Sequence, residues 1–481
     1  MRKKFVANLA LVLILNLLVK PFWIFGIDRA MQNKLGADVY GSYFALYGFS
    51  LLLNILLDLG LNNFNIRNIS QNDKLLSKHF SKILPLKILV SLLYLSVSMI
   101  VAYFLGYDPS QLYLLFFLLL NQVFLSLILY FRSNISALQK YSIDSFISVI
   151  DKLLMIVICS MMLWLPIFQE YIHIEYFVYS QTISLLIGVF ISFFVIYKHI
   201  DIFKPHIDFP FLIVIFRKSY PFALLVLLMS FYNRIDSVML ERLLPISGRE
   251  QAGIYAQSFR ILEALGNFSL LFAGLLLPMF SRMLAEKQNI ENLTQLASKL
   301  LLIPAMMIVV FGSFHSMELM QILYHQHTEI SASIFVLILC CFVPISISYI
   351  YGTLLTANGS LKYLNIMAAS SMLLNITLNF ILIPLFSAKG AAIASLCTQI
   401  YSCIFQFVLV RKFFNFKIGL ISWVKNSIFI FLLLAIVYSL DKYLQNMVLE
   451  LILFLGITAP LLFLLKIVDL KELKENLQKR G

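Results

Sequence analysis

The sequence predicts an all-α integral membrane protein with 14 transmembrane helices. Of its 481 residues, 61% are hydrophobic and 13% are charged, whereas soluble domains are about 45–50% apolar and about 25% charged. Apolar stretches of the length that crosses a bilayer, about 20 residues, recur along the whole chain. Lys and Arg gather in alternate loops between these stretches. These observations exclude a soluble enzyme, a disordered chain and a disulfide scaffold.

The apolar stretches do not alternate with period two, as the strands of a membrane β-barrel would. The first follows Met1-Arg2-Lys3-Lys4 and has no small-residue cleavage site, so we expect a retained anchor rather than a signal peptide. The 14 predicted spans lie at roughly 5–26, 39–62, 83–106, 111–131, 143–167, 172–197, 219–241, 251–281, 297–324, 331–356, 363–385, 388–410, 422–440 and 447–465.

The distribution of basic residues supports this number of spans. If the N-terminus is cytoplasmic, 26 of the 37 Lys and Arg residues fall in cytoplasmic segments, six in outer loops and five within spans. If one span were missed or added, the excess of Lys and Arg would move to the opposite side of the membrane in every loop after that point. We therefore predict a multi-pass protein of the bacterial cytoplasmic membrane with both termini cytoplasmic. The net charge of +13 follows from this orientation, and we expect no nucleic-acid partner.

The loops are too short for a soluble catalytic domain. None exceeds about 20 residues, and the phosphate-binding and nucleophile motifs GxxxxGK[ST], GxGxxG and GxSxG are absent from the sequence. Transport would therefore draw on an ion gradient, the membrane potential or the substrate gradient. The Cys and His residues show no metal-ligand spacing. We predict no catalytic residue, no cofactor and no metal site.

Several short patterns recur in equivalent places of the two halves. Gly41-Ser42-Tyr43 matches Gly253-Ile254-Tyr255, which lies 212 residues later. Matches at similar offsets pair Lys140-Tyr141 with Lys362-Tyr363, Pro166 with Pro384, and Gln181 with Gln399. Such an offset moves six spans, so the repeats share one orientation. The sequence predicts two six-helix lobes, residues 1–205 and 206–415, followed by a helix hairpin and basic tail at 416–481.

Six short motifs carry a family resemblance. They are Asp58-Leu59-Gly60-Leu61, Tyr232-Asn233-Arg234-Ile235-Asp236-Ser237, Ala252-Gly253-Ile254-Tyr255-Ala256-Gln257-Ser258-Phe259-Arg260, Glu263 with Pro278 and Phe280-Ser281-Arg282, Asn358-Gly359 with Lys362, and Pro384 with Lys389-Gly390-Ala391. The chain resembles polysaccharide flippases of the multidrug/oligosaccharidyl-lipid/polysaccharide (MOP) superfamily. The resemblance implies a MATE-like fold that moves a lipid-diphosphate-linked sugar. It also implies membrane lipids, a polysaccharide polymerase and chain-length machinery as partners.

Three basic residues within the spans are candidates to bind a diphosphate. A diphosphate that crosses a medium of low dielectric needs fixed positive charge along its path. At 1.5 Å per residue, Lys20 and Arg234 lie about 22 Å from the inner boundary, and Arg260 lies about 13 Å from the outer one. Arg also offers bidentate contacts to phosphate. We therefore predict that these three residues contact the substrate.

Other polar residues are assigned to sugar contact and ion coupling. The candidates for sugar contact are Tyr232, Asn233, Tyr255 and Gln257, and the candidates for ion coupling are Asp58, Asp236 and Glu263. Structural roles remain open alternatives. Arg260 and Glu263 share a helix face and can neutralise each other, Lys20 and Lys87 can extend toward an interface, and Asp58 can cap a helix or bind an inside Lys. Asn375 and Asn379 suit either substrate contacts or hydrogen bonds between helices.

The function that these features favour is translocation of an undecaprenyl-diphosphate-linked oligosaccharide, such as an O-antigen or capsule repeat unit of a polysaccharide. An ion-coupled multidrug exporter and a lipid II flippase are the alternatives within the superfamily. A membrane-embedded polysaccharide polymerase is the alternative of another class, but its large catalytic loop is missing. A channel is disfavoured because the sequence contains no filter-like loop.

Overall fold

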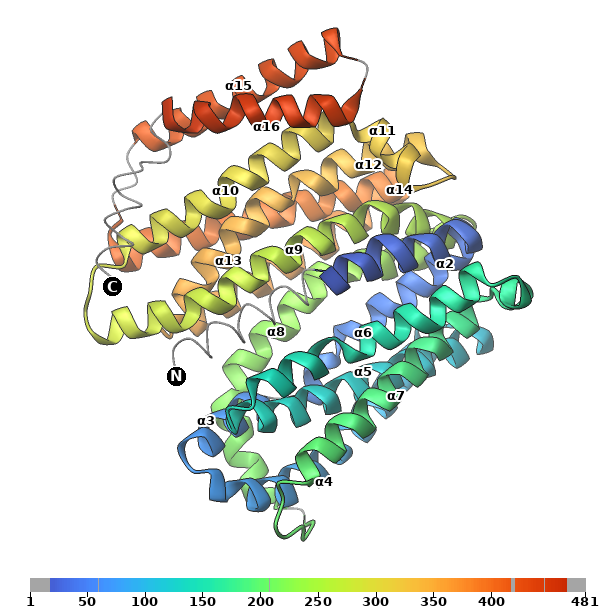
Figure 1. The fold of residues 1–481 in the computed structure, drawn as a ribbon, viewed down its shortest axis with the longest axis vertical. Helices are drawn as coiled ribbons and strands as arrows, with labels where there is room; N and C mark the ends of the chain where they lie inside the picture. Colours follow the sequence, from blue (N-terminus) through green and yellow to red (C-terminus); the bar gives the residue numbers. More distant parts are fainter. Residues whose placement is uncertain (1–17, 59, 207, 417–419, 445, 465–481) are drawn as a thin grey trace. The chain divides into compact units, whose positions relative to one another are not determined.

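The computed structural model describes residues 18–58, 60–206, 208–416, 420–444 and 446–464, and every regular element in these ranges is helical. Figure 1 shows the elements along the chain. The described residues divide into two compact units by packing. Unit 1 comprises those within Met1–Arg260 and Ala368–Ala391, and unit 2 those within Ile261–Met367 and Ala392–Gly481. The predicted lobes at 1–205 and 206–415 rest on sequence duplication and remain a prediction.

The first described helix runs further than the sequence predicted. A π-helical turn, η1 (Trp23–Asp28), leads directly into α2 (Arg29–Leu52). Gly36 breaks α2 with φ +80°, a conformation that glycine adopts without steric cost. The predicted loop at 27–38 is therefore mostly helical, because a single glycine makes the turn between two spans. Residues 5–17 of the first predicted span lie outside the described residues.

The second predicted span ends earlier than expected. A 3₁₀ turn, η2 (Asn54–Leu57), follows α2, and a separate polar helix, α3 (Leu61–Gln71), then packs against α5. The remaining elements of this part of unit 1 are η3 (Asp73–Leu75), α4 (Leu76–Phe104), α5 (Pro109–Ala137), α6 (Tyr141–Trp164), η4 (Pro166–Tyr171) and α7 (Ile174–Tyr197).

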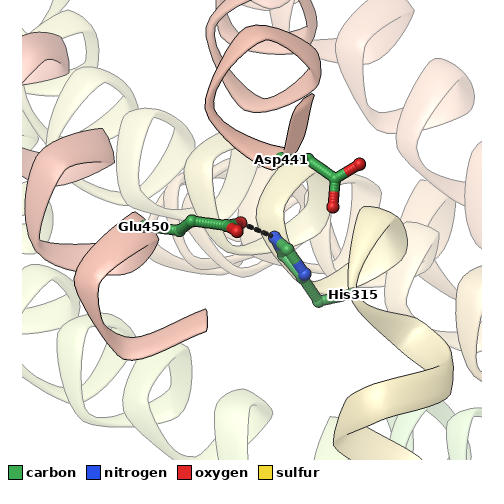
Figure 2. A group of neighbouring side chains, drawn as sticks. All are labelled: His315, Asp441 and Glu450. Carbon is green, nitrogen blue, oxygen red and sulfur yellow. Dashed lines mark ion pairs between the residues drawn. The ribbon is translucent and has the colours of Figure 1, made fainter. Parts of the chain in front are cut away.

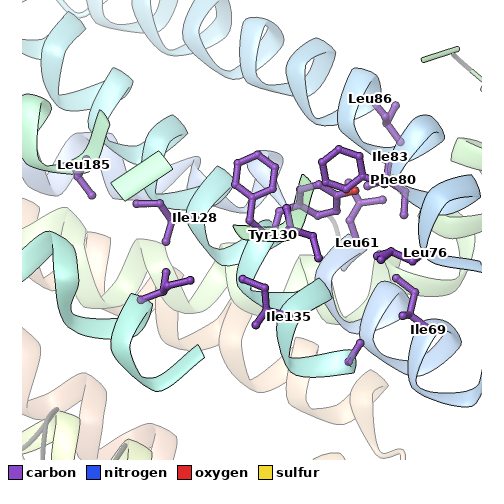
Figure 3. Close-up of a cluster of buried hydrophobic side chains, with 14 of the residues drawn as sticks. Leu61, Ile69, Leu76, Phe80, Ile83, Leu86, Ile128, Tyr130, Ile135 and Leu185 are labelled. Atoms are coloured by element: carbon purple, nitrogen blue, oxygen red, sulfur yellow. The ribbon is translucent and has the colours of Figure 1, made fainter. Parts of the chain in front are cut away.

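Helix α5 is the centre of unit 1, because it packs against α2, α3, α4, α6 and α7. Figure 3 shows the buried cluster that joins several of these helices. Within it the rings of Phe80 and Tyr130 stack with centroids 5.8 Å apart, and Phe80 also stacks on Phe131. Leu61 and Ile69 of α3 belong to the same cluster, so this polar helix is fixed through its apolar face.

Helices α8 (Phe209–Leu243) and α9 (Gly248–Ala285) bring the second repeat against α2. The crossing of α2 and α9 is close enough to require glycine on both helices. A Cβ atom on Gly41 would lie 1.8 Å from the carbonyl oxygen of Arg249, and one on Gly253 would lie 1.9 Å from that of Ala37. Both pairs of equivalent positions, 41 with 253 and 37 with 249, differ by 212. The repeat seen in the sequence is therefore present as a reciprocal contact.

Unit 2 contains α10 (Glu291–Phe314), α11 (Ser316–Leu323), α12 (Thr328–Cys340), α13 (Phe342–Ala357), α15 (Leu420–Tyr443) and α16 (Met447–Leu464). Helix α14 (Leu361–Phe414) contributes to both units and is broken at Ser387, between predicted spans 11 and 12. In Figure 1, α15 and α16 form a hairpin, and α15 packs against α10. The apolar core at this contact includes Val310, Phe311, Leu433 and Phe454.

The helices account for the 14 predicted spans. Within the described residues, nine helical stretches are long and apolar enough to cross a membrane, and one of them, α14, holds two predicted spans. Of the other four predicted spans, the first is described only from residue 18 onward, as helix, and the other three correspond to the part of α2 after Gly36, α15 and α16. The protein is a multi-pass, all-α membrane protein, as predicted.

Candidate functional site

A small cavity in unit 1 brings together predicted site residues from separate helices. We call it the Arg234 cavity. Four of the predicted site residues, Asn233, Arg234, Asp236 and Tyr255, contribute to its wall. The complete lining is Phe44, Tyr47 and Gly48 of α2, Asn233, Arg234, Asp236 and Ser237 of α8, and Tyr255 and Phe259 of α9. The cavity therefore combines a cation, a carboxylate, an amide and several aromatic rings.

Arg234 is half-buried at this cavity. Its guanidinium carbon lies 5.4 Å from the centroid of the Phe259 ring, within the range of a cation–π interaction. The Phe259 ring in turn stacks on Tyr255, with centroids 5.5 Å apart. The aromatic wall thus orients Arg234 beside the cavity, where a planar group with several N–H donors can bind phosphate oxygens.

Arg260 forms a buried ion pair and lies next to the rings of Phe44 and Tyr47. Its Nε lies 2.9 Å from Oδ2 of Asp28 and donates to the hydroxyl of Tyr40 at 3.1 Å, and that hydroxyl donates to Asp28 at 2.7 Å. The guanidinium also lies 5.1 Å and 5.2 Å from the ring centroids of Phe44 and Tyr47, which line the cavity. Arg260 therefore contributes to the wall of the cavity through these rings.

Asp28 was not among the predicted site residues, because the first predicted span ends at residue 26. In the structure the helix continues through η1 and α2, so Asp28 is inside the fold and 2% exposed. A signal was present in the sequence, since an acid directly after an apolar run has to find a partner if the run continues as a helix. The repeat made α2 and α9 equivalent helices, and the structure shows that they approach closely, with Arg260 on α9.

Asp236 is the centre of a buried hydrogen-bond network. Its Oδ1 accepts from the amides of Asn375 at 3.0 Å and Asn379 at 2.6 Å, and its Oδ2 accepts from the Tyr255 hydroxyl at 3.0 Å. The two asparagines are one helical turn apart on α14 and fully buried. Substrate contacts and hydrogen bonds between helices were both considered for these asparagines. In the structure they form hydrogen bonds from α14 to Asp236 on α8. Tyr255 belongs to both the network and the cavity wall.

The other predicted sugar contacts and Lys20 lie elsewhere. Tyr232 and Gln257 are buried, and neither lines the Arg234 cavity. Lys20 is half-buried beside η1, within electrostatic range of Asp151 and Lys152 on α6. Glu263 is half-buried on the part of α9 that belongs to unit 2. These residues are therefore not part of the cavity wall.

Asp58 forms a structural site with Lys87. The Lys87 ammonium lies 3.1 Å from Asp58 and donates to the Leu57 carbonyl at 2.8 Å and the Ser126 hydroxyl at 3.0 Å. Asp58 also accepts from the backbone N–H of Asn62 at the start of α3, at 3.3 Å. Lys87 is fully buried, which contradicts the option that its side chain extends to an interface. Its three oxygen partners explain why the charge stays inside.

Comparison with known proteins identifies the family of this chain. Residues 6–284 match the family described as polysaccharide biosynthesis protein. The chain belongs to this polysaccharide biosynthesis family. No curated protein matches it at a significant level. The match covers the whole of unit 1 up to Arg260, including the α2, α8 and α9 segments that form the Arg234 cavity.

Solved structures share the fold of this family member at low sequence identity. The lipid II flippase MurJ in an inward closed conformation is 16% identical, with a TM-score of 0.71 over 95% of this chain and 98% of that chain. A MATE multidrug transporter of the MOP superfamily, in an inward-facing conformation, is 14% identical, with a TM-score of 0.62 over 85% and 98%. A MOP superfamily transporter from Pyrococcus furiosus Vc1 (DSM3638) is 12% identical, with a TM-score of 0.56 over 85% and 93%. The predicted MATE-like fold is confirmed.

Proposed function

We propose that the protein moves a lipid-linked oligosaccharide, bound through undecaprenyl diphosphate, from the inner to the outer leaflet of the bacterial cytoplasmic membrane. The observation that carries this proposal is the Arg234 cavity, which joins a guanidinium to aromatic and amide groups on three helices. The match to the polysaccharide biosynthesis family supports a glycan as the cargo. Neighbours of the same fold are named as a flippase and as transporters, which supports transport rather than catalysis.

The chemistry of the cavity suits the two polar parts of such a substrate. The half-buried Arg234 guanidinium provides paired N–H donors for diphosphate oxygens. The rings of Tyr47 and Phe259, with the amide of Asn233, offer stacking and hydrogen-bonding surfaces for sugars. The polyprenyl tail is apolar and can stay in the lipid while the head group passes between the helices. Alternating access of the lobes would then expose the site to each side in turn.

Asp236 is the ion-coupling candidate that the site favours. It is a buried carboxylate that lines the cavity and accepts hydrogen bonds from Tyr255 and two asparagines, so a proton or a sodium ion that binds there would change the charge at the cavity wall. Because Tyr255 contacts Asp236 and also lines the cavity, a change at the carboxylate reaches the substrate side of the wall. Asp58, in contrast, is held by Lys87 and the start of α3.

Lipid II is a second candidate substrate, and the similarity to MurJ favours it. Both substrates carry a diphosphate and a polyprenyl chain, so the cation at Arg234 does not separate them. A multidrug exporter would have to bind organic cations, which the Arg234 guanidinium repels and the Asp236 carboxylate attracts, so the cavity does not favour this function over a flippase. Purified protein in vesicles, supplied with lipid-linked repeat units or with lipid II, would decide between the glycans. Faster transfer of lipid II would overturn the polysaccharide proposal.

The exchange Arg234→Ala is expected to stop translocation while leaving membrane insertion intact. Two hydrogen bonds to a charged group contribute about 3 kcal/mol or more, so the transfer rate should fall on the order of 100-fold. Arg234→Lys retains the charge but loses the planar fork, and should be intermediate. The measurement is surface polysaccharide, together with the lipid-linked repeat units stranded on the inner leaflet, in cells that carry each variant as their only copy. Arg411→Ala removes an exposed arginine and serves as the control. Full activity of Arg234→Ala would contradict the proposal that Arg234 binds the diphosphate.

The exchange Asp236→Asn is expected to uncouple transport from the ion gradient. The amide keeps the size of the side chain but removes the charge that a cation would neutralise. Transfer in vesicles should then respond little to an imposed proton or sodium gradient, whereas the wild type responds to one of the two. The exposed acid Asp73 provides the matched control, Asp73→Asn, which should respond as the wild type does. An unchanged gradient response in Asp236→Asn would remove this residue from the coupling mechanism.

A further inference from the structure

A second group of ionisable side chains lies in unit 2, and the proposed function does not use it. His315 stands between α10 and α11, Asp441 in the last turn of α15, and Glu450 in the first turn of α16. One ligand atom of each lies within 4.8 Å of the other two. Figure 2 shows the three side chains converging from these three places in the chain.

Two members of the group are buried among aromatic rings. His315 is 2% exposed and Glu450 is 3% exposed, with the imidazole Nε2 2.9 Å from a carboxylate oxygen of Glu450. Neither of these two atoms meets the geometry of a hydrogen bond. The imidazole centroid lies 4.5 Å from the ring centroid of Phe311, which packs in turn on Phe454. A carboxylate in such surroundings is costly unless it is paired with a charge or coordinates a metal.

We propose that His315, Asp441 and Glu450 bind a zinc ion. Zinc accepts imidazole nitrogen and carboxylate oxygen at ~2.0–2.2 Å, in a tetrahedral arrangement that leaves a fourth position for water. Ligand atoms around such an ion lie roughly 3.4 Å apart, so small side-chain rotations convert the present spacing into a coordination shell. The two carboxylates balance the charge of Zn²⁺. Calcium and magnesium require more oxygen ligands than the group offers.

The placement of the three ligands suggests what the ion does. Asp441 is exposed, so it offers an entry route and can close over an ion that the buried pair already holds. The ion would join the α15–α16 hairpin to the end of α10, which otherwise meet through apolar packing. Under the predicted orientation these helix ends face outward. No metal site was predicted from the sequence, because the three residues, at positions 315, 441 and 450, follow no short spacing.

Zinc binding to the full-length protein in detergent tests the proposal. The affinity tag is removed, the metal is stripped with a chelator, and Zn²⁺ is titrated against a chromophoric competitor. We expect one zinc per chain, a weakening on the order of 10-fold or more in Asp441→Asn, and loss of stoichiometric binding in His315→Gln. Asp441→Asn changes an exposed residue, so its fold should be preserved. Co²⁺ in place of Zn²⁺ should give the absorption of a tetrahedral site.

The control is His173→Gln, which removes an exposed histidine of unit 1. It should bind zinc as the wild type does, and zinc should raise the melting temperature of both, but not of His315→Gln. If the wild type binds no stoichiometric zinc, or if all variants bind it equally, the proposal is overturned and the group is a buried ion pair beside a surface acid. Neither outcome depends on whether the protein moves a lipid-linked glycan.

Discussion

Replacing Gly253 with alanine should destabilise the crossing of α2 and α9 by about 3 kcal/mol or more, at the upper end of what overpacking costs. The added methyl group would lie 1.9 Å from the Ala37 carbonyl oxygen and 2.9 Å from its Cα. These are backbone atoms of a packed helix, so no side-chain rotation relieves the overlap. Gly41→Ala should have the same effect, because its Cβ would meet the Arg249 carbonyl at 1.8 Å. Thermal unfolding of the detergent-solubilised protein, followed by circular dichroism, measures the loss.

The same helix provides the control for this exchange. Gly266 and Gly274 also lie on α9, and a Cβ atom on either would have no neighbour within 4 Å. Alanine at these positions should leave the melting temperature unchanged or raise it, since alanine favours a helix over glycine by about 1 kcal/mol. Equal melting temperatures for Gly253→Ala, Gly266→Ala and the wild type would contradict the close crossing.

Removing one partner of the Asp28–Arg260 pair should cost about 3–5 kcal/mol, because the other charge is left buried. Asp28→Leu leaves the guanidinium buried beside the Tyr40 hydroxyl and removes the carboxylate that lies 2.9 Å from it. Arg260→Met leaves the carboxylate. The double variant, Asp28→Leu with Arg260→Met, removes both charges and should recover most of the lost stability, since apolar replacements of buried pairs are often neutral or favourable. Chemical unfolding of the four proteins gives the coupling energy.

This cycle also separates the structural role of Arg260 from its predicted role in substrate binding. If the only role of Arg260 is to neutralise Asp28, the double variant should translocate as the wild type does. If it also acts on the substrate through the aromatic wall, the double variant should be stable but slow. A coupling energy near zero would mean that the pair contributes nothing to the fold, which the 2.9 Å contact between buried groups argues against.

The fold was predictable to the level of span number and repeat, because both follow from hydropathy and charge. The glycines at 41 and 253 were found as an internal match, and the structure shows why both positions need glycine. The ends of the helices were less predictable. A single glycine with positive φ replaced the predicted loop before the second span, and a polar helix replaced the end of that span. Hydropathy measures the polarity of a segment and not its conformation, so it detects neither the positive φ of Gly36 nor the helical state of the polar segment Leu61–Gln71.

The candidate site was predictable on α8 and α9, where basic and acidic residues interrupt apolar runs. Arg234 and Asp236 were identified in this way, and they lie together with Tyr255, which was predicted as a sugar contact. The partners of these residues were not predictable, because they depend on which helices meet. Asp28 and Tyr40 come from α2 and the turn before it, and Asn375 and Asn379 come from α14. Pairing between distant segments is decided by packing, which one sequence does not reveal.

The hydroxyl of Tyr255 has a single proton, and the structure gives that proton to Asp236. The side chain of Tyr255 also belongs to the lining of the Arg234 cavity. It can therefore serve the carboxylate or a sugar acceptor at one moment, but not both. Under the proposed function, a proton or metal ion on Asp236 would weaken this hydrogen bond and leave the Tyr255 hydroxyl available to the cargo. In that case one phenol group would couple ion occupancy to glycan binding.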